Sequence, residues 1–452
     1  MSNLDTIAAV ATPHGESAIA MIRVSGAASL DLCNAIFSRN SPPPPRRNCY
    51  GSYCSQSGEI LDEVVYSYYR GPSSFTGEDT IEICCHGNPL ISIRILEDLF
   101  ERGCRQAEAG EFSKRAFTNG RMDLTQAEAI MELIHARSEK AIRAANNQLR
   151  GAFGRKLGKL KDDLLASIAT IEAYIDFPEE DLPEEQKQVQ IRSIQNIVTY
   201  CSRMIDSSKY AALLRDGVKT LILGEPNAGK SSLLNCLLGF DRAIVSDEPG
   251  TTRDFLRERV SLGAYSIQLM DTAGLREAES GIEREGIRKT VELSEECDVF
   301  LLVVDSTSPS PALPEEIASR LSKDNCIVVR NKMDLEGTIE LSSDLSDYEL
   351  VEMSASSGDG LESLRNKLHE LIDTHFATDD DDLILVNARH SSALKELNAC
   401  LESAIEKFEM GDDAELIASD MRGALDAIGQ ILGRIDNERM LDVLFSTFCI
   451  GK

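Results

Sequence analysis

The stretch Gly224-Glu225-Pro226-Asn227-Ala228-Gly229-Lys230-Ser231 fits the pattern G-x-x-x-x-G-K-[ST], in which a loop wraps the phosphates of a nucleotide. An apolar run (221–223) precedes it and a helix-like run (232–238) follows it, which is the strand–loop–helix context that the motif needs. The glycines let the backbone N–H groups converge, and the start of the following helix adds partial positive charge. We therefore expect Lys230 to reach the β- and γ-phosphates and Ser231 to hold Mg²⁺.

Four further polar segments follow along the chain, and three of them come directly after an apolar, strand-like run. They are Gly250-Thr251-Thr252-Arg253-Asp254, Asp271-Thr272-Ala273-Gly274, Asn331-Lys332-Met333-Asp334 and Ser354-Ala355-Ser356. The first two can complete the Mg²⁺ shell and contact the γ-phosphate. The Asp334 carboxylate can accept two N–H bonds from guanine, and adenine lacks that donor pair. The Lys332 stem can cover the base plane, and backbone N–H groups of the last segment can meet guanine O6. In this order the five elements predict a GTP site.

The position after Gly274 is occupied by Leu275, where many regulatory GTPases carry a glutamine that orients water. A leucine cannot hold water by hydrogen bonding, so another group must do so. Four acidic candidates follow, namely Glu277, Glu279, Glu283 and Glu285. Asn227 offers a neutral oxygen inside the phosphate loop, and a monovalent cation held there could supply positive charge to the reaction.

The charge balance restricts how the chain can meet nucleic acid. The 452 residues include 47 basic and 75 acidic side chains, a formal net charge of −28. An acidic surface repels phosphate backbones over long range. The composition therefore argues against strong, unaided nucleic-acid binding, and a role on RNA needs a local basic patch or a basic partner.

The apolar runs, the N-terminal residues and the cysteines of the sequence together predict the cellular compartment. Apolar runs such as 299–304 are too short to span a membrane, and the N-terminus has no basic region typical of a signal peptide. The twelve cysteines are scattered without a C-x-x-C pair, so we expect no zinc site and a reduced, cytoplasmic setting.

A chain of this length should form two to four domains. Residues 1–120 have short apolar segments (7–11, 19–24, 64–69 and 80–84) broken by turn formers, which predicts a mixed, strand-rich domain. Residues 121–216 and 377–452 are predicted to be helical. Residues 217–376 alternate strand and helix patterns, which predicts a doubly wound, Ras-like P-loop domain. The simplest architecture inserts this α/β domain into a helical domain whose two parts share one core; two separate bundles are the alternative.

Particular helices and strands follow from local patterns. Thr125-Gln126-Ala127-Glu128 is interpreted as a capping box that opens a long helix with an apolar face at Ile130, Leu133 and Ile134. Residues 157–175 have leucine and isoleucine at three- and four-residue spacing, typical of a bundle helix. Buried parallel strands are expected at 220–223, 267–270, 299–304, 327–329 and 350–353, and an acidic linker at 379–382.

Two polar clusters in the first domain leave their role open. Residues 70–79 are rich in turn formers, and residues 110–117 mix aromatic and charged side chains. On the residues alone, solvated loops are favoured over a binding site.

The whole chain resembles the MnmE (TrmE) family of tRNA-modification GTPases. The shared motifs in the GTP-binding part are G-E-P-N-A-G-K-S-S, G-T-T-R-D and D-T-A-G-L-R-E. The flanks are more specific: Asp5-Thr6-Ile7, residues 74–79, Gly110-Glu111-Phe112-Ser113, residues 123–129, and Phe448-Cys449-Ile450-Gly451-Lys452 at the end of the sequence.

The resemblance implies roles for particular residues. The N-terminal domain would dimerise and bind 5-formyl-tetrahydrofolate or a related one-carbon folate, with contacts from Arg23, Glu82, Arg121 and Lys452. Arg121 departs from the family, in which lysine is common. Mg²⁺ would be held by Ser231 and Thr252, and K⁺ by Asn227, Ser246, Glu248 and Thr251. Lys230 and Glu283 would be catalytic, with Glu283 as general base. The nucleotide would be contacted by Asn227, Ala228, Gly229, Lys230, Ser231, Ser232, Ser246, Asp247, Glu248, Pro249, Gly250, Thr251, Thr252, Asp271, Thr272, Ala273, Gly274, Asn331, Lys332, Asp334, Ser354, Ala355 and Ser356.

The resemblance also implies a reaction and partners. A homodimer would hydrolyse GTP when its two G domains meet across K⁺. Together with an FAD-binding partner, MnmG, in a heterotetramer, it would add an aminomethyl-type (carboxymethylaminomethyl) group at C5 of the wobble uridine, position 34, of certain tRNAs. FAD would enter only through the partner. Because the chain is acidic, we hypothesise that the partner supplies most of the basic tRNA surface.

Cys449 has two interpretations. A lone cysteine without a nearby histidine in the sequence is a weak nucleophile, so the residues alone favour packing and chemistry equally. The resemblance favours a role in the modification.

Two other functions remain as alternatives to the enzyme. A GTP-dependent ribosome-assembly factor or switch would have a similar G domain, but it should carry a basic RNA-binding module, and none is visible in the sequence. A non-catalytic acidic scaffold with a vestigial nucleotide site is disfavoured because Lys230, Asp271 and Asp334 are intact.

Overall fold

The computed structural model describes most of the chain: residues 5–38, 42–176, 184–240, 257–271, 283–311, 313–376, 384–411, 413–433, 441 and 444–451. Its internal contacts divide into two compact units. The first unit comprises Met1–Met131, Leu149–Asp162 and Leu425–Lys452, and the second comprises Glu132–Gln148 and Asp163–Ala424. Chain segments that are far apart in sequence therefore share each unit.

The first unit is built on a six-stranded sheet with the order β3-β4-β5-β2-β1-β6. All neighbouring strands are antiparallel except β1 and β6, which are parallel. The strands are β1 (Ile7–Val10), β2 (Ile19–Ser25), β3 (Asn48–Cys54), β4 (Ile60–Tyr69), β5 (Thr80–His86) and β6 (Arg105–Gln106). Four of the six were predicted from their apolar segments, whereas β3 and β6 are too polar to be recognised.

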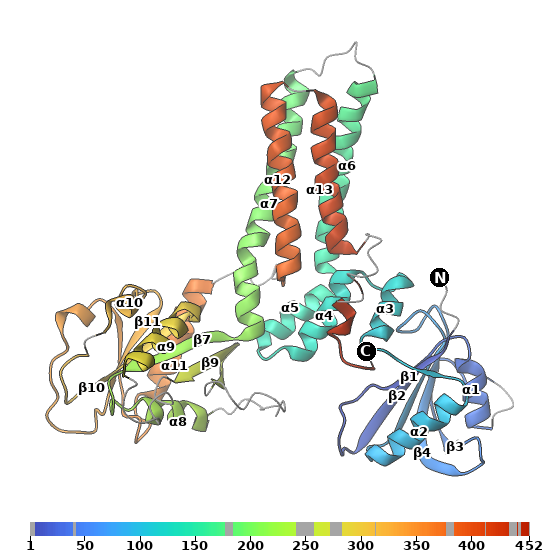
Figure 1. Cartoon of the computed structure of the whole chain (residues 1–452), viewed down its shortest axis with the longest axis horizontal. Coiled ribbons are helices and arrows are strands. Elements are labelled where there is room, and N and C mark those ends of the chain that lie inside the picture. The colour runs from blue at the N-terminus through green and yellow to red at the C-terminus, as the bar shows by residue number, and fades with distance from the viewer. Residues whose placement is uncertain are drawn as a thin grey trace. The chain divides into compact units, whose positions relative to one another are not determined.

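One face of this sheet forms a core with helices α1 (Ser29–Ile36) and α2 (Pro89–Glu101), which Figure 1 shows beside the strands. Side chains on alternate positions, such as Tyr53, Val64 and Ile83, point into this core and are almost fully buried. Helix α2 begins where the Asn88 side chain accepts a hydrogen bond from the backbone N–H of Leu90 at 2.9 Å.

The capping box of helix α4 (Leu124–His135) differs from the prediction. Asp123, not Thr125, occupies the cap: its Oδ1 accepts the N–H of Gln126 at 2.9 Å, and Gln126 Oε1 accepts the N–H of Asp123 at 3.0 Å. The helix is also short, and its buried face includes Leu124 and Ala127, whereas Ile134 is 41% exposed. The expected apolar face is therefore wrong at Ile134, whereas Leu133 packs against a buried core, as expected.

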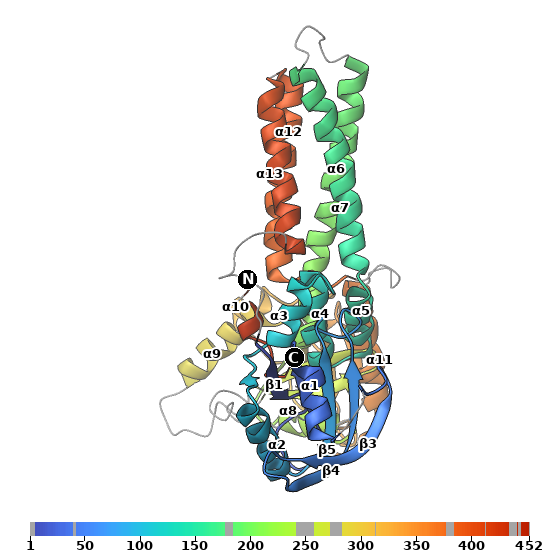
Figure 2. The same cartoon turned by 90° about the vertical axis from the view of Figure 1, so that its right-hand side faces the viewer.

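The remaining long helices confirm the predicted bundle. They are α6 (Ala152–Asp176), α7 (Glu184–Asp216), α12 (Ala388–Met410) and α13 (Ala414–Leu432). The shorter α5 (Glu139–Leu149) lies outside the bundle, and its buried alanines pack in the core of the inserted domain. In the second unit, α6 from Asp163, α7, α12 and α13 up to Ala424 lie side by side (Figures 1 and 2). Asn398 of α12 donates to the Ser202 hydroxyl of α7 at 3.0 Å. Helices from both sides of the inserted domain thus share one core, and the alternative of two separate bundles is wrong.

The inserted domain has a second six-stranded sheet, with the order β12-β11-β10-β7-β9-β8. Its strands are β7 (Val218–Gly224), β8 (Arg257–Leu262), β9 (Tyr265–Asp271), β10 (Val299–Asp305), β11 (Cys326–Asn331) and β12 (Glu349–Glu352). All pairs are parallel except β8 with β9. The five predicted strands are present. The prediction that 350–353 is a buried strand is wrong in part, because β12 lies at the edge and Leu350 is 42% exposed.

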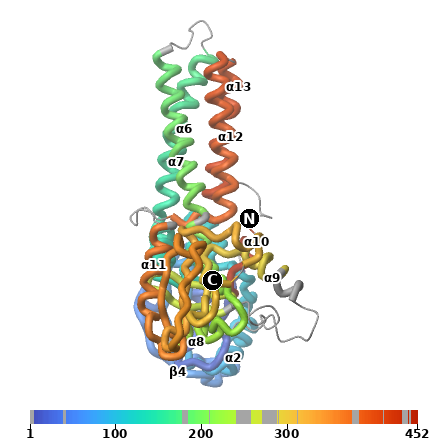
Figure 3. The backbone as a smooth tube through the Cα atoms, turned by 90° about the vertical axis from the view of Figure 1, so that its left-hand side faces the viewer, coloured from blue at the N-terminus to red at the C-terminus, as the bar shows by residue number. Residues whose placement is uncertain are grey.

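Helices cover both faces of this sheet, as in a doubly wound fold. Helices α8 (Lys230–Phe240) and α11 (Leu361–Phe376) pack on one core, together with the end of α7. Helices α9 (Glu283–Glu296) and α10 (Glu315–Ala318) pack on the other. Figure 3 shows α11 and α9 on opposite sides of the domain. The remaining described elements are α3 (Glu111–Thr118) and a 3₁₀ turn at Ser343–Leu345.

A polar cluster within the second unit ties α5 to this sheet. The Lys140 ammonium donates to the Tyr265 hydroxyl of β9 at 2.6 Å and to Asp373 of α11 at 3.1 Å. The Tyr265 hydroxyl also donates to Asp373. Three elements from two predicted domains therefore meet at one charged group.

No helix among those that the structure describes is long and apolar enough to cross a membrane. The expected acidic linker at 379–382 lies outside the described residues.

The observed cap of α4 leads to a testable difference. Replacing Asp123 with alanine removes the acceptor for the Gln126 N–H and should destabilise the first unit by about 1 kcal/mol. Asp123→Asn is the matched control, since asparagine is an equally good cap and should cost a few tenths of that amount. Urea unfolding of the three proteins measures the effect; equal losses for both variants would contradict the assigned cap.

Candidate functional site

The phosphate-loop motif lies between β7 and α8, as predicted. Gly224 and Gly229 have φ angles of 145° and 99°, and Asn227 adopts φ 63°, in the left-handed region that non-glycine residues seldom enter. A Cβ atom on Gly229 would lie 2.1 Å from Nδ2 of Asn331, so the close approach requires glycine. This backbone shape is that of a loop wound around a small central volume, which suits phosphate oxygens.

The side chain of Lys230, the first residue of α8, extends back toward the start of this loop. Its ammonium donates to the carbonyl oxygens of Gly224 at 3.0 Å and Glu225 at 2.7 Å. The side chain is 8% exposed, so its charge is held at the mouth of the loop. Ser231 and Ser232 follow and are exposed on the first turn of the helix.

Asn331 joins three segments of the candidate site. Its side chain is 2% exposed at the end of β11. Nδ2 donates to the carbonyl of Ala228 at 2.9 Å, and Oδ1 accepts the N–H of Ala355 at 2.9 Å. One amide therefore fixes the phosphate loop and the 354–356 segment to each other, which is a more structural role than the sequence indicated.

Lys332 also has a left-handed backbone, with φ 66°. Its ammonium lies 2.6 Å from Oδ2 of Asp305, at the end of β10. Burial raises the pKa of Asp305, but hydrogen bonds from Lys332 and Thr307 outweigh it and leave the pKa below its usual value. The ionised pair orients the lysine stem beside the segment that carries Asp334.

Asp334 is exposed and faces the 354–356 segment. Hydrogen bonding by Ser354 and Ser356 holds the pKa of its carboxyl below the usual value. The Ser356 hydroxyl lies 3.5 Å from Oδ2 of Asp334, and 2.9 Å from the Ser354 hydroxyl. The carboxylate is thus ionised at neutral pH and can accept two N–H groups from a planar base.

The remaining predicted nucleotide contacts are only partly described. Asp271 is the last residue of β9 and pairs with Ile222 of β7. Its backbone therefore lies at the carboxyl-terminal end of the parallel strands, where the phosphate loop also begins. Its side chain and that of Glu283, the first residue of α9, lie outside the described residues. So do Ser246, Asp247, Glu248, Pro249, Gly250, Thr251, Thr252, Thr272, Ala273 and Gly274.

A second group of predicted residues meets in the first unit. Arg23 of β2 and Glu82 of β5 are cross-strand neighbours, and their side chains form an ion pair at 2.9 Å. The guanidinium carbon of Arg23 lies 4.8 Å from the ring centre of Phe75 and 5.7 Å from that of Phe112. Phe112 is fully buried beneath Arg23, so the charged pair and the partly exposed Phe75 ring form the surface that is suited to a planar, polar heterocycle.

Residues 445–451 run into the same region. Ile450 forms a β-bridge with Ala109, and the Gly451 carbonyl lies 3.5 Å from Nη1 of Arg23. A Cβ atom on Gly451 would lie 2.3 Å from the carbonyl oxygen of Val10. Lys452 lies outside the described residues. The Cys449 side chain is exposed, so it does not pack in the core of the first unit.

Arg121 reaches this region through the 74–77 loop. Its Nε donates to the carbonyl of Ser74 at 3.2 Å, next to Phe75. The structure therefore gathers Arg23, Glu82, Arg121 and the residue before Lys452 around one loop. Phe75 and Phe112 were not singled out as site residues from the sequence.

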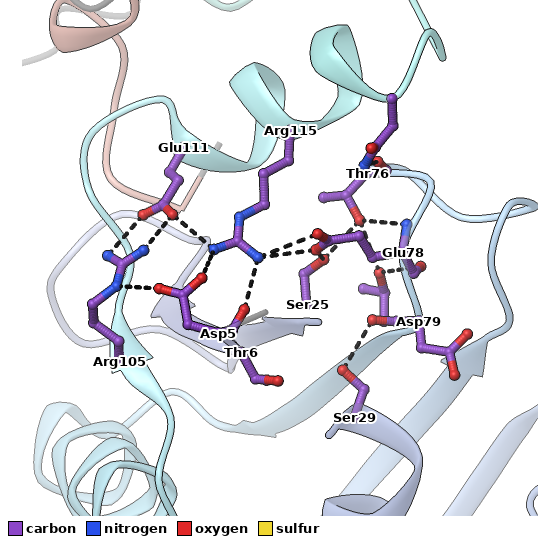
Figure 4. A network of polar contacts seen from close by, with 12 residues as sticks. Asp5, Thr6, Ser25, Ser29, Thr76, Glu78, Asp79, Arg105, Glu111 and Arg115 are labelled. Carbon is purple, nitrogen blue, oxygen red and sulfur yellow. Dashed lines mark hydrogen bonds and ion pairs between the residues drawn. The ribbon is translucent and has the colours of Figure 1, made fainter. Parts of the chain in front are cut away.

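A charge network around the buried Arg115 and Glu111 side chains supports this loop (Figure 4). The Arg115 side chain is 6% exposed. Its two terminal nitrogens contact the carboxylates of Asp5 and Glu111 at 2.9 Å and that of Glu78 at 3.1 Å. Glu78 Oε2 accepts the Ser25 hydroxyl at 2.8 Å, so the 74–79 loop is bound to both β2 and α3.

The carboxylates of this network are stabilised in the charged form. Hydrogen bonding from Arg105 is the largest influence on Asp5 and lowers its pKa. Burial raises the pKa of Glu111, but hydrogen bonds from Arg105, Glu108 and Arg115 reverse the shift. Both folded-state pKa values lie below the unfolded ones, so these groups contribute stability at neutral pH that is lost as the pH falls through the folded-state values.

The interpretation of 110–117 as a solvated loop is wrong, because Phe112, Ser113 and Ala116 are fully buried within α3. Their helical spacing in the sequence was the signal that could have indicated this.

Comparisons with known proteins cover the whole chain. A family model described as the MnmE helical domain matches residues 124–449, and one described as the GTP-binding protein TrmE N-terminus matches residues 6–121. The tRNA modification GTPase MnmE of Opitutus terrae is 48% identical over 449 residues, covering 99% of each chain. The protein of the same name from Aquifex aeolicus is 40% identical over 449 residues, covering 99% of this chain and all of the relative.

Among solved structures, the chain is similar to the G domain of the T. maritima FeoB iron transporter. The two are 28% identical, with a TM-score of 0.25, and the match covers 34% of this chain and 98% of that one.

The buried network gives a prediction with an internal control. Arg115→Met leaves the Glu78 carboxylate without its cation, while Glu111 keeps its ion pair with Arg105, and it should cost about 1–3 kcal/mol. Arg94 forms an exposed pair with Glu59 at 2.7 Å, and Arg94→Met should cost less than about 1 kcal/mol. Hydrogen exchange of the β1 and α3 amides in a urea series measures both. Similar losses for the two variants would show that the network is not a stabilising element.

Proposed function

The chain belongs to the MnmE family of tRNA-modification GTPases, and we propose that its GTP hydrolysis is K⁺-activated and serves modification at C5 of the wobble uridine, position 34, of certain tRNAs. The added group is of the aminomethyl type (carboxymethylaminomethyl), and its one-carbon unit comes from a tetrahydrofolate. The single observation that carries the GTP assignment is the Asn331 amide. It holds the phosphate loop against the segment that faces the ionised Asp334 carboxylate.

The residues of the phosphate loop fit the two cations that the family implies. Asn227 presents an exposed side chain from a left-handed backbone position, and Ser231 is exposed at the start of α8. We assign Ser231 and Thr252 to Mg²⁺, and Asn227, Ser246, Glu248 and Thr251 to K⁺. The cations neutralise charge that develops on the phosphates, in a role that an arginine supplies in other GTPases.

The protein's own groups then have separate tasks. Lys230 binds the β- and γ-phosphates, and its ammonium already lies at the loop, where it donates to the Gly224 and Glu225 carbonyls. Glu283, at the start of α9, is the proposed general base for the attacking water, since Leu275 cannot orient water. Asp334 selects guanine. Hydrolysis depends on two G domains of a homodimer meeting.

The folate is assigned to Arg23, Glu82, Arg121 and Lys452. The fit rests on the Arg23–Glu82 pair beside the partly exposed ring of Phe75, which offers donors, an acceptor and an aromatic side chain to a fused heterocycle. The folate supplies a one-carbon unit when bound. The chain's residues bind and orient it, and Cys449, exposed and two residues from Gly451, is the proposed participant in the modification.

The partners and domains follow from the same proposal. We infer a homodimer, a heterotetramer with an FAD-binding MnmG-type protein, and tRNA as the substrate, in the cytoplasm. The proposed domains are residues 1–120 for dimerisation and folate, 121–216 and 377–452 for the helical domain, and 217–376 for GTP.

Base selection is tested at Asp334. Asp334→Asn replaces one acceptor oxygen by a donor NH₂, which mismatches guanine but matches xanthine, whose C2 carries an oxygen. We expect kcat/KM for GTP to fall by a factor of about 10² or more and that for XTP to rise. Steady-state kinetics with both nucleotides measures this, and an unchanged preference for GTP would remove Asp334 as the base reader.

The cation and the reaction are tested separately. GTP turnover should be faster in KCl than in NaCl at equal ionic strength, and Asn227→Ala should abolish the difference; equal rates in both salts would refute the K⁺ site. Mass spectrometry of wobble uridines from cells lacking the protein tests the tRNA reaction. An unchanged modification profile would refute it while leaving the GTPase activity untouched.

A further inference from the structure

The start of helix α6 reverses the charge of the chain. Residues 150–161 hold five lysines and arginines and no aspartate or glutamate, although the whole chain has 47 basic and 75 acidic side chains. We call these residues the basic surface: Arg150, Arg155, Lys156, Lys159 and Lys161. They all lie within the first compact unit.

The helix turns this charge toward solvent. Arg155 and Lys159 are one turn apart and exposed, and Arg150 is exposed just before the helix. Leu157 and Leu160 lie on the opposite, buried side. The apolar side of the helix therefore packs in the core, and the charged side is exposed to solvent.

Local stability does not account for this arrangement. Cations four residues apart on a helix repel each other, and a helix N-terminus favours anions, yet α6 has no acidic residue in its first turn. Among the described residues, no ion pair involves Arg150, Arg155, Lys159 or Lys161. The Arg155 guanidinium donates to the carbonyl of Arg150 at 2.6 Å, which leaves its other N–H groups available. Asp162 and Asp163 follow the basic surface and are exposed three and four residues after Lys159, so the part without a local acidic neighbour is its start, at Arg150 and Arg155. Exposed cations there are available to an anionic ligand.

The basic surface adjoins the segment that carries Cys449. Gln126 of α4 donates to the carbonyl of Leu149 at 2.9 Å, immediately before the surface begins. On the same helix, Leu124 and Ala127 pack with Phe445 and Phe448. One helix of the same unit thus separates the cations from the residue proposed for the modification.

We propose that the basic surface binds the phosphate backbone of tRNA. This inference rests on the proposed function, and it adds a place on this chain where the substrate is held. An RNA backbone presents regularly spaced negative charges without requiring base contacts, which matches a row of flexible cations with few other polar groups. An acidic protein partner is the competing occupant.

The test uses the full-length protein and fluorescein-labelled tRNA, with binding followed by anisotropy between about 50 and about 200 mM KCl. The variant is Arg155→Gln with Lys159→Gln. The matched control is Arg192→Gln with Arg203→Gln, which removes the same charge from two exposed positions of α7. GTP turnover and thermal unfolding of each protein show whether it is folded.

We expect the variant to bind tRNA about tenfold more weakly at low salt, and its log Kd to depend less steeply on log salt by about 2. The control and the GTPase rate should be unchanged. Arg155→Glu with Lys159→Glu should weaken tRNA binding further without unfolding the helix, because glutamate is a good helix former and Arg155 lies in the first turn, where an acidic residue is favourable.

Unchanged affinity and salt dependence in the glutamine variant would overturn the proposal. The proposal would also be overturned if the glutamine variant bound tRNA normally but failed to support wobble modification in cells. The basic surface would then serve a protein partner. Binding does not depend on the uridine chemistry. Weakened binding in the variant, combined with unaltered wobble uridines in cells lacking the protein, would therefore refute the proposed reaction and leave the tRNA surface standing.

Discussion

The hydrogen bonds of one buried amide hold the nucleotide-binding part together. Asn331 donates to the phosphate loop at Ala228 and accepts from Ala355, so the two ends of a bound nucleotide would meet segments that are already linked. Gly229 must be glycine because this amide occupies the space that a Cβ atom would need. The conformational entropy of the phosphate loop and the Ala355 segment is therefore lost on folding, and nucleotide binding does not have to order them.

The sequence predicted the inserted domain well because its strands are simple. The central strands β7, β10 and β11 are covered on both faces, so they appear as unbroken apolar runs. Strand β8 was missed because its Arg257–Leu262 sequence is charged and pairs only along one edge. The cap of α4 was displaced because Thr125 is as plausible a cap as Asp123 until the hydrogen bonds are known.

The nucleotide site could be predicted from the sequence in more detail than the site around Arg23. The phosphate loop and Asp334 are contiguous motifs whose chemistry is visible in the residues themselves. The surroundings of Arg23 depend on Phe75, Phe112 and Gly451, which come from three distant parts of the chain. The Arg115 network likewise joins positions from 5 to 115. The helical spacing around Phe112 could have indicated its burial, but without the fold nothing in the local sequence shows that these distant residues meet.

The segment that carries Cys449 is anchored on both sides. Phe448 is buried before it, and after it Gly451 fits against the backbone of Val10 so closely that only glycine is accommodated. A thiol on so short a tether explores a small volume. Its effective concentration near Arg23 is therefore set by the backbone, and a reaction there would behave as an intramolecular step. Lengthening the segment by even one residue would dilute the thiol without altering its chemistry.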